Sequence, residues 1–458
     1  MQMKKVMEKK IILIILAVLL LVLAAVYQQI SNKQDTLSLL NKVEPKAVQY
    51  KEIKGSYPTY ELIDEEGQFL NYAIITSSSG YGGPITTLTA IDKEGSIVNV
   101  AILEHAETPS YINRVLDEGY PENLQGKLIS ERLGDQDGID AISGATRTSE
   151  GIITSVEKGM IQVGDNQLGV AVPELETFQF QWQDGVIVAL LLVMLLAAVK
   201  KIRKLRPWLL VASVIVIGFM TKTSLTVGNF TSIMANKMPA FGERPIWFIL
   251  VIGILLITLL SGKNLYCAWL CPFGAVQEGI YKALHLKSIK VNRKIVDAAR
   301  KSRWLFIWLA SMLVFLFNNP GIASYEPFSA FFGGEGTTAQ WIILGIVLLM
   351  SIFTLRFWCS SFCPVGAILD ATASLKRKIK KRGRDKGTVP LSHSTNMVGQ
   401  GTRPAVPCSS SVCNSCKSGC GNATKAAFFS SSDKLFAGMV IVVDLLILVP
   451  LLQNSGLV

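Results

Sequence analysis

The sequence repeats one cysteine-bearing segment, which reads YCAWLCPFGA over residues 266–275 and WCSSFCPVGA over residues 358–367. The spacing of each Cys-x3-Cys-Pro predicts that both sulfurs share one helical face, about 6 Å apart along the axis, and that the proline ends or kinks the helix. Two such helix ends that meet about a pseudo-two-fold axis would offer four thiolates to one iron–sulfur cluster. These four are Cys267, Cys271, Cys359 and Cys363.

The other four cysteines lie in one polar stretch with the spacing Cys-x4-Cys-x2-Cys-x3-Cys. Because all eight cysteines fall into tight groups, metal or iron–sulfur ligation is favoured over scattered core positions. A [4Fe-4S] cluster and a zinc ion both suit four thiolates, and incidental membrane cysteines are the alternative for the two repeated pairs. The members of the last group are Cys408, Cys413, Cys416 and Cys420.

Composition indicates a membrane protein. Half of the 458 residues are apolar and 17% are charged, and the mean hydropathy is +0.39. Ordinary soluble enzymes and disordered chains need more polar surface. We therefore expect a multi-pass α-helical membrane protein with about seven spans. The apolar runs cover residues 11–26, 185–199, 208–227, 246–260, 304–317, 341–355 and 436–452.

The net charge of +11 is unevenly distributed. Residues 31–184 hold 24 Asp and Glu against 11 Lys and Arg, whereas the rest of the chain holds 10 against 34. The basic clusters lie in short loops beside apolar runs, where Lys and Arg set orientation, so nucleic acid is not an expected partner. This rule places residues 31–184 outside the cytoplasmic membrane and the second cysteine group inside.

Five segments are expected from these patterns. A signal anchor begins the chain, although a cleaved signal peptide is the alternative for the same run. The exported part has strand patterns at 72–77, 85–91 and 97–103 and helical patterns at 111–117 and after 148, which predict an α+β domain. The segments are 1–30 (anchor), 31–184 (exported domain), 185–372 (membrane domain), 373–434 (small Cys-rich cytoplasmic segment) and 435–458 (last span).

Three motifs in the exported domain resemble the FMN-binding domain of RnfG/NqrC-type subunits. They are GYGGPI at 80–85, HAETP at 105–109 and DAISGAT at 140–146. The last matches the flavinylation pattern Asp-x-x-Ser/Thr-Gly-Ala-Thr of that family. The resemblance implies that Thr146 carries FMN through a phosphoester and that a flavin transferase makes this bond from FAD.

The small residues before Thr146 let backbone N–H groups approach a phosphate. His105 and Glu107 are expected to line the flavin or the motif turn, although Ser110 stands where the family usually has glycine. The residues assigned to cofactor binding are Asp140, Ser143, Gly144, Ala145, Thr146, His105, Glu107 and Thr108.

The two cysteine repeats resemble NosR/NapH-type membrane iron–sulfur proteins, and an exported FMN domain ahead of them is the NosR/NirI arrangement. The resemblance implies a redox carrier in the cell membrane rather than a stand-alone enzyme, serving electron donor and acceptor proteins or quinone. A redox sensor or maturation factor, an ion-pumping subunit and a terminal flavin reductase are the alternatives. Asp444, inside the last apolar run, is the one carboxylate suggested for proton or quinone chemistry.

Overall fold

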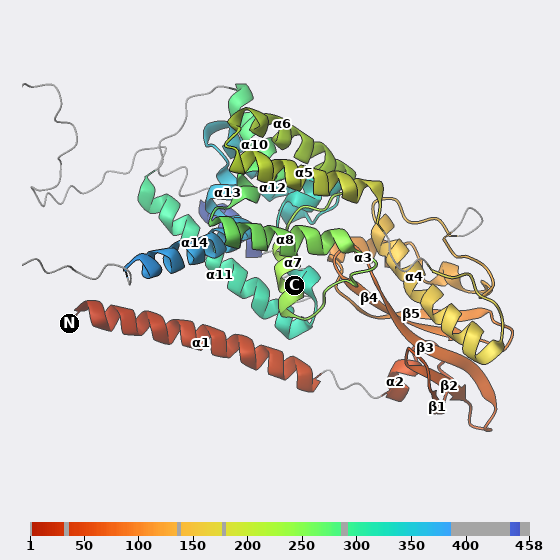
Figure 1. Cartoon of the computed structure of the whole chain (residues 1–458). Coiled ribbons are helices and arrows are strands. Elements are labelled where there is room, and N and C mark those ends of the chain that lie inside the picture. Colours follow the sequence, from red (N-terminus) through yellow and green to blue (C-terminus); the bar gives the residue numbers. More distant parts are fainter. Residues whose placement is uncertain are drawn as a thin grey trace, which may run out of the picture.

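The computed structural model describes residues 2–31, 36–134, 139–175, 180–284, 292–385 and 440–448. Figure 1 shows a long N-terminal helix, α1 (Gln2–Ser31), a domain built on a β-sheet, and a body of helices. Helix α1 lies along the helical body, where the indole N–H of Trp308 donates to the carbonyl of Ala17 at 3.1 Å. The cysteines at 408–420 lie outside the described residues.

The sheet is an antiparallel meander in which the five strands follow their sequence order. Ile, Val and Thr recur in its long strands, since branched side chains suit a pleated and half-buried surface. The three strands expected from the sequence are confirmed as parts of β3, β4 and β5. The strands are β1 (Gln49–Ile53), β2 (Thr59–Ile63), β3 (Phe69–Ser79), β4 (Pro84–Ile91) and β5 (Ile97–His105).

Helix α4 (Thr146–Val163) packs across β3 and β4. Its apolar side chains join one buried cluster with Ile74 of β3. The neighbouring Ala73 belongs to a second cluster on the other face, with Leu40 of α2 (Thr36–Leu40), because successive side chains of a strand alternate between faces. The α+β prediction is confirmed. The remaining elements of this domain are α3 (Pro109–Asp117), η1 (Glu122–Leu124) and η2 (Gly164–Leu168).

The helical body follows the sheet domain in the chain, and residues 440–448 add a further helix to it. Its elements are α5 (Trp182–Val199), η3 (Arg203–Leu205), α6 (Arg206–Ser213), η4 (Val214–Met220), α7 (Val227–Met234), α8 (Pro245–Ser261), α9 (Leu265–Trp269), α10 (Pro272–Leu284), α11 (Arg293–Phe317), η5 (Pro320–Ala323), η6 (Ser329–Gly333), α12 (Thr338–Phe353), α13 (Phe357–Ser361) and α14 (Pro364–Asp385).

Two described helices are long and apolar enough to cross a membrane, at Ile11–Ile30 and Trp182–Val199. The count rises to three if α8 and the helical stretch Leu265–Leu284, which bend by 100° at a short break, form one broken or re-entrant span. Helix α12 is shorter, and the apolar run at 208–227 is divided between α6 and the π-helix η4. The protein thus has membrane-type helices, while the number of seven spans stays a prediction.

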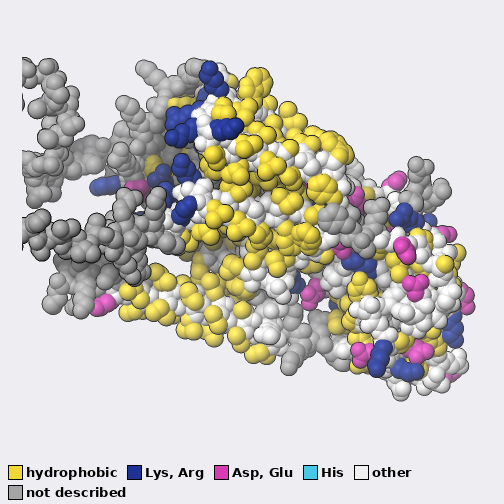
Figure 2. Space-filling model, in the orientation of Figure 1, with side chains coloured by type: hydrophobic (Ala, Val, Ile, Leu, Met, Phe, Trp, Pro, Cys, Tyr) yellow, Lys and Arg dark blue, Asp and Glu magenta, His cyan; other side chains and the backbone are white. Residues whose placement is uncertain are grey.

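Figure 2 shows apolar side chains over the middle of the helical body and Lys and Arg gathered at its end remote from the sheet domain. Trp208 is 74% exposed and Leu260 is 69% exposed. A broad exposed apolar surface is unfavourable in water and typical of contact with lipid. The charged sheet domain lies beyond the opposite end of this apolar zone.

The sheet domain is held on the helical body by the loop between α7 and α8. Glu243 of this loop pairs with Lys158 of α4 at 2.5 Å and accepts from the backbone N–H of Ser79 at 2.7 Å. Gly321 lies so close to the sheet domain that a Cβ there would overlap the carbonyl oxygen of Glu107. Only glycine fits this contact, so the two parts are closely packed at the junction.

Candidate functional site

Thr146 is an exposed residue at the first position of α4. The preceding turn needs Gly144, whose φ of +89° lies in the left-handed region that other residues rarely adopt. The N-terminus of a helix has free N–H groups and a positive dipole end, so a phosphate on the Thr146 hydroxyl is favoured there. Ser143 and Asp140 are exposed in the same turn, and Ala145 is buried beneath it.

A cavity of about 230 Å³, the Thr146 cavity, opens beside this turn. The sheet domain contributes one wall, in which the rings of Tyr81 and Tyr111 meet edge to face with centroids 4.9 Å apart. The helical body contributes the other wall. The lining residues are Tyr81, Tyr111, Gly144, Ala145, Thr146, Arg147, Thr148, Gln183, Met220, Thr221 and Lys222.

Glu107 is fully buried and holds the motif turn from below. Its carboxylate accepts from the backbone N–H of Gly82 at 3.1 Å and from the hydroxyl of Thr148 at 3.2 Å. Burial raises the pKa of Glu107 to about 7, against the opposing effect of these hydrogen bonds. Glu107 therefore positions Thr148 and the start of α4, and it is not among the residues that line the Thr146 cavity.

His105 and Thr108 lie on either side of Glu107. His105 ends β5, outside the lining of the Thr146 cavity, and burial lowers the pKa of its imidazole. Thr108 precedes α3 and lines a second cavity, the junction cavity, of about 80 Å³. This cavity lies between the sheet domain and the helical body, and it shares Tyr81, Tyr111 and Lys222 with the Thr146 cavity.

A third cavity, of about 250 Å³, is lined by all four cysteines of the repeated segments, and we term it the four-cysteine cavity. It shares Leu225 and Phe328 with the junction cavity. Four thiols around one space fit the four protein ligands of an iron–sulfur cubane. Among the described residues, no three His, Cys, Asp or Glu side chains converge tightly enough to hold a single metal ion.

The backbone around each cysteine pair differs from the expected single helix. Helix α9 ends at Trp269, Cys271 follows it, and Pro272 begins α10. The second copy repeats this arrangement at α13, Cys363 and α14. Proline lacks an N–H and suits the first turn of a helix, so it starts a new helix in a new direction. The two sulfurs of a pair therefore come from a helix and a turn rather than from one helical face.

Backbone N–H groups donate to the buried sulfurs in both copies. Gly274 N–H lies 3.4 Å from Cys271 Sγ, and Gly366 N–H lies 3.3 Å from Cys363 Sγ. The amide of Gln277 donates to Cys359 Sγ at 3.4 Å. Hydrogen bonds to ligand sulfurs are one way in which proteins set the reduction potential of a cluster.

Two arginines lie beside the four-cysteine cavity, and Asp370 also lines it. Arg356 lines it and donates to the carbonyl of Cys267 at 2.5 Å, and Arg206 donates to the carbonyl of Ala268 at 2.9 Å. Both guanidinium groups also pair with the buried Glu278, at 2.7 Å for Arg206 and 2.8 Å for Arg356. The sequence by itself assigns no site role to Arg206, Arg356 or Gln277. In the sequence, these three residues are marked only by their closeness to apolar runs or to the cysteine repeats.

Comparison with known proteins agrees with these two sites. A family model described as an FMN-binding domain matches residues 80–160. A model described as a 4Fe-4S binding domain matches residues 243–293 and 340–382, which include the four cysteines of the repeats.

Two of the relatives are NosR and NapH proteins. Regulatory protein NosR of Stutzerimonas stutzeri is 27% identical over 247 residues, which cover 49% of this chain and 33% of NosR. Ferredoxin-type protein NapH of Haemophilus influenzae is 27% identical over 138 residues, which cover 29% of this chain and 47% of NapH. The matches thus span a third to a half of these relatives.

Among solved structures, NqrC of Shewanella oneidensis is 21% identical, with 28% of this chain and 72% of NqrC covered and a TM-score of 0.21. The family matches establish FMN and iron–sulfur centres as the cofactors. The chain therefore joins an FMN-binding domain to a 4Fe-4S binding domain, in the arrangement of the NosR-type fused FMN-binding iron–sulfur proteins.

Proposed function

We propose that the chain carries electrons between an iron–sulfur centre in the four-cysteine cavity and FMN bound covalently to Thr146. The observation that supports this most is the row of three cavities. The Thr146 cavity and the junction cavity share Tyr81, Tyr111 and Lys222, and the junction cavity and the four-cysteine cavity share Leu225 and Phe328. FMN exchanges one or two electrons and a cluster exchanges one, so together they connect one-electron and two-electron partners.

Thr146 supplies the attachment point. Its hydroxyl oxygen forms the bond to the FMN phosphorus of FAD, AMP leaves, and the hydroxyl proton is released. The exposure of Thr146 lets a flavin transferase reach it. Once attached, the phosphate lies at the N-terminus of α4, where the helix dipole favours negative charge.

The four cysteines of the repeats supply the thiolates, and the cations around them offset the negative charge of a thiolate-bound cluster. Arg356 and Arg206 are held in place by Glu278, which itself pairs with both. We propose that Cys408, Cys413, Cys416 and Cys420 bind a second centre on the cytoplasmic side, because that stretch has the spacing of a four-thiolate site.

The membrane arrangement supports electron flow within one chain. In the proposed topology the sheet domain, residues 31–184, is extracytoplasmic and the Lys- and Arg-rich end of the helical body is cytoplasmic, as the positive-inside rule requires. The chain bends after α8, and Cys267 of α9 and Cys271, which follow the bend, line the four-cysteine cavity. The four-cysteine cavity shares Leu225 and Phe328 with the junction cavity, which supports direct electron transfer to the flavin without a bridging quinone.

The tether is tested by the intact mass of the denatured protein. We expect one FMN in the wild type and none in Thr146→Val. Thr154→Val, a matched change on the same helix, should keep the flavin. Equal masses without FMN in all three proteins would remove the tether from the proposal.

Electron transfer is tested by following the flavin absorbance after the clusters have been reduced anaerobically. We expect flavin reduction in the wild type and its loss when the four-cysteine cavity is disabled by Cys271→Ser. Flavin reduction at the wild-type rate in that variant would contradict the route through this cavity.

A second candidate function is redox-dependent regulation, because NosR is named a regulatory protein. It predicts that a partner protein binds the oxidised and reduced chain with different affinities. The ion-pumping alternative has less support, since Asp444 has a hydrogen-bond partner in the hydroxyl of Ser302 at 3.1 Å.

A further inference from the structure

Three cations line the Thr146 cavity and the junction cavity within the described residues: Arg147, Lys222 and Arg244. Arg147 pairs with Glu150 at 3.3 Å and donates to Gln181 at 2.8 Å. Arg244 donates to the carbonyls of Gly80 and Tyr81. No hydrogen bond or ion pair of the Lys222 ammonium group is found in the described part of the chain, so Lys222 is the one of these three residues whose charge is unpaired there.

Lys222 also has an unusual backbone. Its φ of 52° lies in the left-handed region, and its carbonyl accepts from the hydroxyl of Tyr81 at 2.7 Å. A non-glycine residue pays an energetic cost for this conformation, which persists only where surrounding contacts enforce it and which is frequent at ligand sites. The contact with Tyr81 places the η4–α7 turn directly over the wall that both cavities share.

The junction cavity also contains buried polar atoms that need a ligand or water. One oxygen of Glu326 accepts from the backbone N–H of Val227 at 2.6 Å, while Oε2 has no partner in the described structure although Glu326 is 2% exposed. Ser224 Oγ and Trp247 Nε1 line the same cavity and are likewise buried without a partner. The pyrimidine edge of an isoalloxazine ring alternates C=O and N–H groups and can pair with donors and acceptors of this kind.

We propose that the isoalloxazine ring of the FMN on Thr146 docks across these two cavities, against the helical body, and that Lys222 stabilises its reduced form. This inference rests on the proposed tether at Thr146. Two electrons, supplied one at a time by the iron–sulfur centre, and one proton convert the oxidised ring into the reduced ring with one negative charge. The ammonium group of Lys222 attracts that charge and so raises the reduction potential of the flavin.

The experiment is a spectroelectrochemical titration of the flavin in the full-length protein, with covalent FMN verified by intact mass. In Lys222→Gln, the equilibrium constant for flavin reduction should fall at least tenfold relative to the wild type. This equals a shift of about 30 mV to lower potential for a two-electron couple. Lys222→Arg retains the charge and should keep the wild-type potential. Lys201→Gln is the matched control, because Lys201 also has a left-handed backbone but lies between α5 and η3, away from both cavities.

An unchanged potential in Lys222→Gln, or an equal shift in Lys201→Gln, would overturn the inference while leaving the tether intact. A wild type without covalent FMN would instead overturn the proposed function itself. Docking is tested independently in the wild type with iodide, a soluble quencher of flavin fluorescence. We expect much weaker quenching than for free FMN, and quenching equal to that of free FMN would show that the ring is not docked.

Discussion

The Thr146 site and the four-cysteine cavity differ in how far their reactive side chains are exposed to solvent. Thr146 is exposed on a turn at the start of α4, whereas Cys271 and Cys363 are 8% and 4% exposed and come from segments 92 residues apart. A hydroxyl on a turn can be modified after folding is complete. Buried thiols from two distant segments must meet their cluster as the helices assemble, and metal binding then contributes to folding.

The largest effect is expected from Cys271→Ser, which removes one ligand of the four. Iron and sulfide analysis should show the loss of one cluster per chain, and the helical body should unfold at a lower temperature. Ser360→Ala, beside Cys359, is the control and should keep both. If Cys271→Ser retains full iron and sulfide, the four-cysteine cavity is not a cluster site. The Thr146 site should still accept FMN, because its turn lies in the other part of the molecule.

The next largest effect concerns Glu107 beneath the Thr146 turn. Burial raises its pKa from 4.5 to about 7, so the folded state binds a proton that the unfolded state has already lost between these pH values. The contribution of Glu107 to the free energy of unfolding is therefore fully present below about pH 4.5. It decreases by about 3 kcal/mol as the pH rises to about 7. Above pH 7 this contribution is constant.

Thermal unfolding of the sheet domain within the full chain, from pH 4.5 to 8, measures this dependence. Subtracting the curve of Glu107→Gln from that of the wild type isolates Glu107 from other titrating groups. The difference in stability between the wild type and Glu107→Gln should change sharply between about pH 4.5 and 7. Parallel curves would mean that Glu107 keeps an ordinary pKa in its buried position.

A smaller effect is expected at the junction that joins the two sites. Gly321→Ala places a Cβ against the Glu107 carbonyl and should destabilise the packed junction by about 1–3 kcal/mol. Gly345→Ala in α12 is the matched control, because a Cβ there meets no atom within 4 Å. Equal melting temperatures for the two variants would show that the sheet domain and the helical body are not tightly packed.

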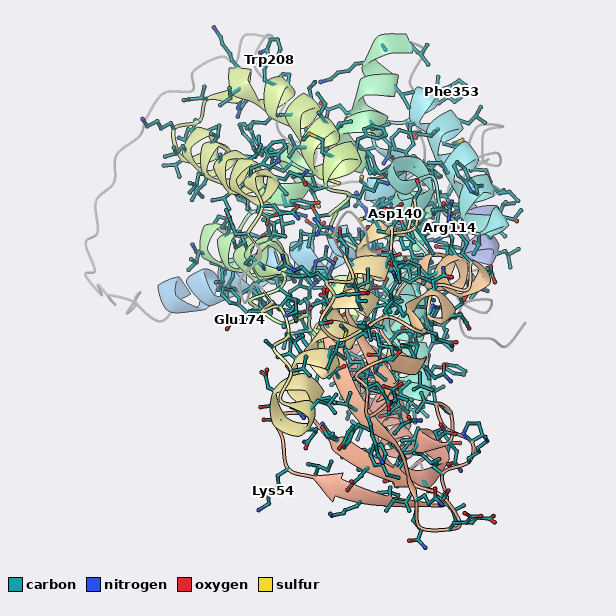
Figure 3. All side chains as sticks on the ribbon, turned by 90° about the vertical axis from the view of Figure 1, so that its right-hand side faces the viewer. Lys54, Arg114, Asp140, Glu174, Trp208 and Phe353 are labelled. Carbon is teal, nitrogen blue, oxygen red and sulfur yellow. The ribbon has the colours of Figure 1, made fainter. Side chains whose placement is uncertain are left out.

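The smallest effect is expected at the exposed rim of the junction. Figure 3 shows Arg114 and Asp140 where the sheet domain meets the helical body, with Lys54 at the far end of the sheet. Arg114 pairs with Glu335 of the helical body, and the two side chains are 38% and 24% exposed. Solvent screens such pairs, so Glu335→Gln should cost less than about 1 kcal/mol. A larger loss in denaturant unfolding would identify this pair as a principal tie between the two parts.

Much of the sheet domain could be predicted because its signals are local. Alternating Ile, Thr and Val residues predicted β3, β4 and β5, and the turn at 140–146 was recognised from a contiguous motif. The single-helix geometry of the cysteine pairs was wrong, because spacing alone does not show that Pro272 begins a new helix. The position of Lys222 within the apolar run 208–227 does not indicate that it lines two cavities.

The order of residues along the chain by itself determined the membrane character, the three strands, the cysteine groups and the Thr146 motif, because each depends on composition, periodicity or contiguous spacing. Only the tertiary structure decided that the three cavities share lining residues, that Arg356 and Gln277 lie beside the cysteines, and that the carbonyl of Lys222 meets Tyr81 of the sheet domain. These relations join residues about 80 to 140 positions apart. They depend on how helices pack around a junction, and no local pattern encodes that packing.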